Sequence, residues 1–116
     1  MNTLRNKVQL IGHLGANPEI RSFENGKSVA RFTLATTDSY TDPSGKKISD
    51  TQWHNIVAWG GLAKTAEKYL LKGSEIAVEG KLVHRTFDGK DGNKKYYTEV
   101  IINDMVMFRN RNEKDS

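Results

Sequence analysis

The 116-residue sequence contains no cysteine, which excludes disulfide bonds, thiol catalysis and zinc sites built on cysteine. This lack is compatible with a reducing compartment. No apolar run comes near the roughly 20 residues that a membrane-spanning helix needs. The first residues carry no apolar stretch of the signal-peptide kind either, so we expect a cytoplasmic protein.

Signatures of catalysis and of metal binding are missing as well. The histidines His13, His54 and His84 form neither an HxH nor an HExxH pattern, so we expect no metal site. The sequence has no GxSxG motif, no P-loop and no paired-carboxylate signature, and Asp88 and Asp91 fit turn positions. We therefore expect a protein that is not an enzyme and that uses no cofactor.

Size and charge indicate a small basic domain. A chain of this length forms one domain, which buries roughly two-thirds of the surface that its unfolded chain exposes. The formal net charge is +4 and the pI is about 9.4. This bias is compatible with a polyanionic ligand but is too small to establish one.

Two tryptophans carry the strongest functional signal. Trp53 and Trp59 are six residues apart in a segment typical of a β-strand, so both side chains point to the same face. His54, Ile56 and Ala58 lie on the opposite face. In a basic chain, two indoles in a row suggest a platform on which unpaired bases stack. The alternative is a buried core face, since large aromatic side chains are usually mostly buried.

Alternating apolar and polar residues predict a mostly β structure. Asn25-Gly26 is a strong hairpin signal, and residues 88–93 resemble a second, charged hairpin tip. The polar segment 38–50 is predicted as a loop that projects as a flexible arm or a long hairpin. The expected strands are residues 6–14 with a short continuation over 19–23, then 28–37, 51–59, 74–87 and 94–108.

One helix of about ten residues is predicted between the third and fourth long strands, because Leu62, Ala66, Tyr69 and Leu70 have helical spacing. Gly73 stands where a helix C-terminal glycine belongs. Three strands, a helix and two strands is the order of the five-stranded OB-fold barrel, an all-β fold with one helix (β-β-β-α-β-β).

Order alone does not decide the fold, because other small β-barrels and sandwiches can also carry one helix. The mid-strand glycines Gly12 and Gly80 favour a barrel, since small barrels bend their strands sharply and glycine permits the bend.

Several strings in fixed order resemble bacterial single-stranded DNA-binding proteins, and the resemblance runs over residues 6–108. It implies an OB-fold protein that coats single-stranded DNA without sequence preference, usually as a homotetramer. The strings that carry it include residues 6–19, 25–26, 34–36, 53–54, 72–74, 79–82 and 98–100.

The resemblance also implies that bases stack on Tyr40, Trp53, Trp59 and Phe87. Trp53 keeps the residue type common in the family. Trp59 stands where phenylalanine is frequent, and Tyr40 and Phe87 stand where tryptophan is frequent. All four positions stay aromatic, which preserves the stacking role. Each stacked base contributes about 1–3 kcal/mol without any reading of sequence.

The remaining aromatic residues are predicted to be structural. Phe32 alternates with apolar neighbours and belongs to the core, and Tyr69 is expected to pack its helix on the barrel. Tyr96 and Tyr97 have opposite parity, so one of them should face outward.

Basic residues from separate segments are predicted to bind phosphates. Each neutralised phosphate contributes roughly −0.7 to the log–log salt slope on a single strand. Arg31 and Arg85 in strands and Lys72 at the helix end are the preferred individual candidates. In the family, the histidine after this tryptophan contributes to subunit contacts, which implies an interface role for His54. The predicted phosphate-binding residues are Arg31, Lys72, Arg85, Lys46, Lys47, Lys90 and Lys94.

We expect an OB-fold domain over residues 1–108 and a short, polar, frayed end over 109–116. Many family members end in an acidic tail that recruits partner enzymes. Residues 109–116 do not resemble that tail. The sequence is either that of a member without a tail or a shortened form, so it does not support partner recruitment by this route.

The sequence thus predicts a non-enzymatic, cytoplasmic, nucleoid-associated protein that protects single-stranded DNA in replication, repair and recombination. One alternative is a primosomal or RNA-binding OB accessory protein, which would bind more weakly or recognise 2′-hydroxyls. Another is a protein-interaction OB module that uses the aromatic face as a hydrophobic contact.

Overall fold

The computed structural model describes residues 4–108, which form six strands and one helix. The predicted polar end 109–116 lies outside the described residues. Within them, no helix has the length and apolar character needed to cross a membrane. The elements are β1 (Val8–Leu14), β2 (Glu19–Ser22), β3 (Ser28–Thr41), β4 (Lys47–Trp59), α1 (Gly61–Tyr69), β5 (Glu75–Asp88) and β6 (Lys94–Met107).

Five of the strands close into a barrel, as predicted for an OB-fold. The sheet order is β1-β5-β6-β4-β3-β2, and an additional β1–β3 pairing joins its ends. β1 makes the closure by itself, since it pairs with β5 from Val8 to His13 and with β3 at His13 and Leu14. β4 and β6 pair in parallel. The predicted continuation over residues 19–23 is a short separate strand, β2, which within residues 4–108 pairs only with β3.

Gly12 and Gly80 allow the barrel strands to approach closely. A Cβ atom on Gly12 would collide with the carbonyl oxygen of Ala35, and one on Gly80 would collide with the carbonyl oxygen of Ile101. The β5–β6 register also shifts between Glu79 and Gly80. Both glycines are therefore required by backbone contact at the points where strands bend, as the sequence indicated.

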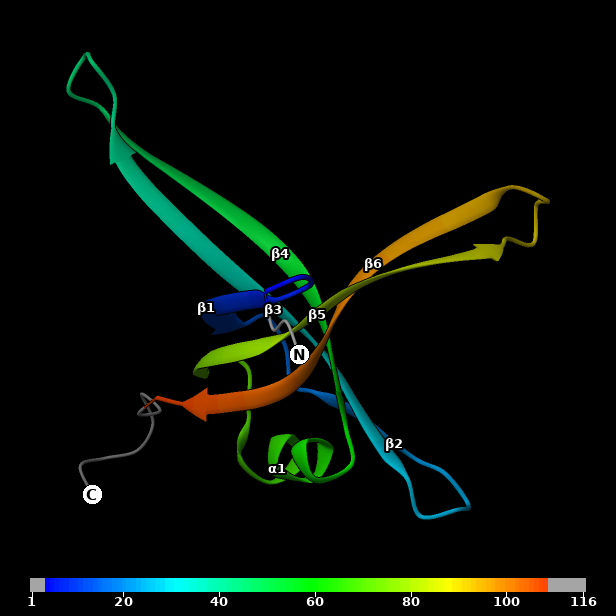
Figure 1. Cartoon of the computed structure of the whole chain (residues 1–116). Coiled ribbons are helices and arrows are strands. Elements are labelled where there is room, and N and C mark those ends of the chain that lie inside the picture. Colours follow the sequence, from blue (N-terminus) through cyan, green and yellow to red (C-terminus); the bar gives the residue numbers. More distant parts are fainter. Residues whose placement is uncertain (1–3, 109–116) are drawn as a thin grey trace.

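Alternate residues of the strands fill the barrel. Ala30, Phe32 and Leu34 are buried, as predicted. Ile56 and Ile76 reach the same core from β4 and β5. The small side chains of Ala63 and Ala66 are fully buried and let α1 pack closely against β3 and β4. Figure 1 shows α1 below the barrel, away from the two long hairpins.

The prediction of a loop over residues 38–50 is wrong, whereas the long hairpin is confirmed. β3 and β4 remain paired as far as Thr41 and Lys47. Hydroxyl groups of Thr37 and Thr51 lie 3.2 Å apart, and those of Ser39 and Ser49 lie 3.3 Å apart. This β3–β4 arm (residues 37–51) projects away from the barrel (Figure 1). Both faces of the ladder are largely exposed, so the sequence there shows no apolar alternation.

Two details of the helix differ from expectation. α1 ends at Tyr69, and Leu70 already has an extended backbone, so Gly73 does not terminate the helix. Gly73 has a φ of 90° in the following turn, where the backbone N–H of Ser74 donates to the carbonyl oxygen of Leu71. Tyr69 is 51% exposed, whereas Leu70 beside it is buried in the core. The packing of Tyr69 on the barrel stays a prediction.

Candidate nucleic-acid interface

Both tryptophans lie on the outer face of β4. Trp53 is 61% exposed and Trp59 is 41% exposed, whereas Ile56 and Ala58 on the opposite face are buried. Val57 lies between the two indoles on the outer side but is covered by its neighbours. The shared face predicted from the spacing is confirmed. The alternative that the tryptophans form a core face is excluded.

Gly15 lies close to the indole of Trp53. The backbone N–H of Gly15 donates to the carbonyl oxygen of Thr33 at 3.1 Å, which holds the end of β1 against β3. A Cβ atom on Gly15 would collide with ring atom Cζ3 of Trp53. The glycine thus leaves room for the ring to lie close to the backbone at the end of β1.

Two further rings stack on the predicted stacking residues. Phe23 packs against Trp59 with ring centroids 6.2 Å apart and an interplanar angle of 22°. Tyr97 packs against Phe87 at 5.2 Å and 26°. The sequence did not single out Phe23, and left open which of Tyr96 and Tyr97 takes part. Both tyrosines are exposed because they lie on the projecting β5–β6 hairpin, and only Tyr97 stacks on Phe87.

A buried carboxylate joins two of the predicted phosphate-binding residues. Nη1 of Arg31 donates to Oε2 of Glu99 at 2.7 Å, and Nε of Arg85 donates to Oε1 of the same carboxylate at 2.8 Å. Glu99 is 6% exposed. Burial raises the pKa of Glu99, but the hydrogen bonds from Arg85 and Arg31 outweigh it and leave that pKa below its usual value.

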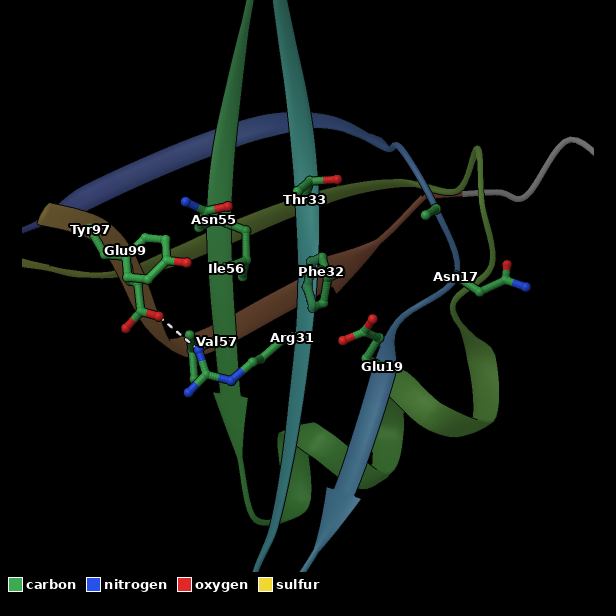
Figure 2. A pocket seen from close by; sticks show the side chains of 11 residues that line it. Asn17, Glu19, Arg31, Phe32, Thr33, Asn55, Ile56, Val57, Tyr97 and Glu99 are labelled. Atoms are coloured by element: carbon green, nitrogen blue, oxygen red, sulfur yellow. Dashed lines mark hydrogen bonds and ion pairs between the residues drawn. The ribbon is translucent and has the colours of Figure 1, made fainter. Parts of the chain in front are cut away.

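These residues form one surface, which we call the aromatic face: Phe23, Arg31, Trp53, Trp59, Arg85, Phe87, Tyr97 and Glu99. A groove of about 340 Å³ lies at its centre, between Arg31, Asn55, Tyr97 and Glu99 (Figure 2). A second groove of about 290 Å³ shares Arg31 and extends to Trp59 and Phe23. A third of about 250 Å³ shares Asn55 and Tyr97 and extends to Trp53. The three grooves therefore share lining residues on the surface between the two tryptophans.

Tyr40 stands apart from this surface. It is exposed on the β3–β4 arm and pairs with Ile48. Trp53 pairs with Ala35, five residues before Tyr40 on the same strand, so Tyr40 has the opposite parity and lies on the other face of the ladder.

The predicted lysines are spread around the molecule. Lys46 and Lys47 lie at the end of the β3–β4 arm, and Lys90 and Lys94 lie at the end of the β5–β6 hairpin (Figure 1). Lys72 is nearer, because its backbone N–H donates at 2.7 Å to Oδ1 of Asn17, a residue that lines the central groove.

Two of the histidines, His54 and His84, each lie beside a threonine hydroxyl group. His54 Nε2 is 3.0 Å from the hydroxyl oxygen of Thr36, and His84 Nδ1 is 3.0 Å from that of Thr98. Residues 4–108 contain no group of three or more His, Asp or Glu side chains arranged to hold a metal ion. The interface role of His54 stays a prediction.

Comparison with known proteins agrees with this geometry. The profile of the Single-strand binding protein family matches residues 5–108. The chain belongs to this family. Among curated members, Single-stranded DNA-binding protein 1 of Chlorobaculum tepidum is 50% identical over 104 residues, which are 89% of this chain and 64% of that protein. The single-stranded DNA-binding protein of Neisseria meningitidis serogroup A is 41% identical over 108 residues, 93% of this chain and 62% of that protein.

Solved structures of the family superpose well on this chain. The Plasmodium falciparum SSB in complex with ssDNA has a TM-score of 0.82 and 33% identity, and covers 94% of this chain and 100% of that chain. A deletion mutant of the single-stranded DNA binding protein from Thermus aquaticus has a TM-score of 0.76 and 34% identity, over 91% of this chain and 51% of that chain. The chain thus spans less than two-thirds of the length of several relatives. The predictions of the OB-fold and of the family are confirmed.

Proposed function

We propose that the protein binds single-stranded DNA without sequence preference and does so by stacking bases on the aromatic face. The observation that carries this proposal is the exposure of Trp53 and Trp59 on one strand face, with grooves that share lining residues between them. A monomeric fold gains little from leaving two large rings in water, whereas unpaired bases would cover them. Membership of the single-strand binding protein family supports the same ligand.

On this face the aromatic residues bind bases and the arginines bind phosphates. The Trp59–Phe23 and Phe87–Tyr97 pairs supply rigid apolar surfaces at its two ends, and Trp53 supplies a third. A base offers a π-face whatever its identity, so such contacts tolerate any sequence. Arg31 and Arg85 lie between the rings, where they can bind the phosphates that link stacked bases.

A longer strand would extend from the face onto the hairpins. Lys46 and Lys47 on one hairpin and Lys90 and Lys94 on the other then bind phosphates beyond the central groove. Lys72 does so beside it. To reach Tyr40, the strand must leave the aromatic face and pass around the β3–β4 arm, because Tyr40 lies on the other side of that ladder.

We also propose that the protein assembles into a homotetramer. Ile11 and Val106 are 59% and 55% exposed on either side of Ala77, and Met107 and Phe108 extend this apolar patch. In the described residues, β1 from Val8 to Gly12 pairs only with β5, so its other edge can accept a strand. A second copy of the chain could bury the apolar patch and pair with the open edge of β1. His54 is the further candidate for a subunit contact.

The biological role that follows is coating exposed single strands during replication, repair and recombination. The cytoplasm, at the nucleoid, stays the predicted location because that is where bacterial chromosomes expose single strands. We propose binding rather than catalysis for the whole of this surface.

Competition binding separates this function from its alternatives. We expect a fluorescent dT oligonucleotide to be displaced by unlabelled DNA of mixed sequence, and much less by matched RNA or duplex DNA. Preferential displacement by RNA would favour an RNA-binding accessory protein. No binding to any of these, together with nuclease-resistant capture of a protein partner, would favour the protein-interaction module.

A further inference from the structure

Glu99 is unusual on a face that should attract DNA, because it is the acidic residue buried between two cations. It lies on β6, whereas Arg85 lies on the neighbouring β5 and Arg31 lies on β3, beyond β4. Arg31 and Glu99 are 68 residues apart in the sequence. Figure 2 shows the Arg31 side chain crossing in front of Val57 to meet Glu99. A single carboxylate therefore draws together cations from both sides of the face.

Coulomb attraction alone gives Glu99 an unfavourable role in DNA binding. The cluster of Arg31, Arg85 and Glu99 carries a net charge of +1, and removing the carboxylate would raise it to +2. A uniform electrostatic account therefore expects tighter binding without Glu99. The hydrogen-bond geometry instead indicates that Glu99 favours DNA binding.

Each guanidinium gives Glu99 a single donor nitrogen and keeps the others. Arg31 uses Nη1 and Arg85 uses Nε, and among the described residues neither makes another side-chain hydrogen bond. A guanidinium carries five N–H donors, so most remain available. The side chains of Arg31 and Arg85 are 52% and 50% exposed, while that of Glu99 is 7% exposed. The carboxylate thus holds both forks from the inner side and leaves their outer sides to solvent.

We infer that Glu99 is a positioning residue, which organises Arg31 and Arg85 into one two-guanidinium phosphate site at the centre of the aromatic face. Without it, two like-charged, flexible side chains on strands β3 and β5 would separate. With it, their forks stay between the Trp59–Phe23 and Phe87–Tyr97 pairs, where phosphates of a stacked strand pass. This inference rests on the proposed function.

The test compares three variants in dT oligonucleotide binding over a range of salt concentrations. Glu99→Gln keeps the size of the side chain and removes its charge. Glu67→Gln makes the same charge change on the exposed surface of α1 and is the matched control. Glu99→Asp keeps the charge and shortens the side chain, so it tests the positioning of the arginines at constant net charge. It also replaces Glu99→Gln in the test if that variant fails to fold. Thermal melts confirm that each variant is folded.

We expect Glu99→Gln to weaken binding roughly tenfold, although it adds positive charge, because the charge-assisted contacts to phosphate lose their geometry. The log–log salt slope should fall by up to about 1.4, the contribution of two phosphates on a single strand. Glu99→Asp should weaken binding in the same direction, and Glu67→Gln should bind as the wild type or slightly more tightly. A loss of folded protein alone would not change the slope.

Two results would overturn the inference. The first is that Glu99→Gln binds at least as tightly as Glu67→Gln and keeps the full salt slope. The second is that a folded Glu99→Asp binds like the wild type. If the wild-type protein itself fails to bind dT oligonucleotides, the proposed function fails instead, so the two failures are distinct.

Discussion

The indole of Trp53 rests on the backbone of Gly15, with no room for a side chain between them. The contact joins the end of β1 to the outer face of β4, two segments that the sequence separates widely. Trp53 is nevertheless 61% exposed, so most of the ring remains available to a ligand.

Replacing Gly15 by alanine should displace this ring. We expect Gly15→Ala to weaken dT binding by up to about tenfold, within the 1–3 kcal/mol that one stacked base contributes. Tryptophan fluorescence and oligonucleotide titration measure both effects. Gly61→Ala is the control, because nothing lies near a Cβ atom at Gly61 and the residue begins a helix. Equal affinity of Gly15→Ala and wild type would show that the contact does not orient the ring.

Truncation of the stacking residues should weaken binding without unfolding the protein. We expect Trp53→Ala, Trp59→Ala and Phe87→Ala each to lose about 1–3 kcal/mol of dT binding free energy, since each removes a platform for a base. Tyr69→Ala removes an equally exposed ring from α1 and should leave affinity unchanged. Wild-type affinity of either tryptophan variant would contradict the stacking assignment.

The lysines of the β3–β4 arm should contribute charge without stacking. We expect the double variant Lys46→Ala/Lys47→Ala to lower the salt slope for long dT strands by up to about 1.4, roughly 0.7 per phosphate. The quenching of tryptophan fluorescence at saturation should stay the same, because both lysines lie at the far end of the arm. Lys64→Ala on α1 is the control. An unchanged slope would mean that the strand does not reach this hairpin.

The charge on Glu99 should make stability depend on pH in the acid range. Its pKa in the folded protein lies below the ordinary value of 4.5, so the folded state binds the proton less readily than the unfolded state. The resulting stabilisation is present above pH 4.5 and is lost as the pH falls through the folded-state pKa. Urea unfolding over this range should show a smaller acid-induced decrease in unfolding free energy for Glu99→Gln. An identical decrease in both proteins would rule out this contribution.

Charge placed in the apolar patch should prevent assembly. We expect Val106→Asp to dissociate the homotetramer, because a second copy would have to bury an unpaired carboxylate. Sedimentation or light scattering measures the mass of each species. Thr86→Asp places the same charge on an exposed residue of β5 outside the patch and is the control. A wild-type protein that is already monomeric would remove the assembly proposal.

Much of the barrel follows from strand alternation, because one face of each strand is buried. Ala30, Phe32 and Leu34 share the inner face of β3 as their spacing indicates. The same rule fails over residues 38–50, where the arm leaves the barrel and both faces are largely exposed. Pairing there depends on contacts between two hydrophilic strands, such as Ser39 with Ser49, and these leave no apolar period in the sequence.

The site was only partly predictable for a related reason. The common face of Trp53 and Trp59 is a local property of one strand, so spacing predicts it. The partners Phe23 and Tyr97 depend on which strands become neighbours. Positive charge predicts phosphate-binding residues, and this signal does not indicate Glu99. Nothing in the local sequence indicates that a carboxylate lies between two distant arginines.

Titration with poly(dT), followed by tryptophan fluorescence at low and high salt, tests the central claim most directly. We predict strong quenching that saturates at a defined number of nucleotides per subunit and persists in part at high salt, because stacking survives when phosphate contacts are screened. Absence of quenching, together with absence of a mobility shift, would contradict the claim that the exposed indoles bind single-stranded DNA.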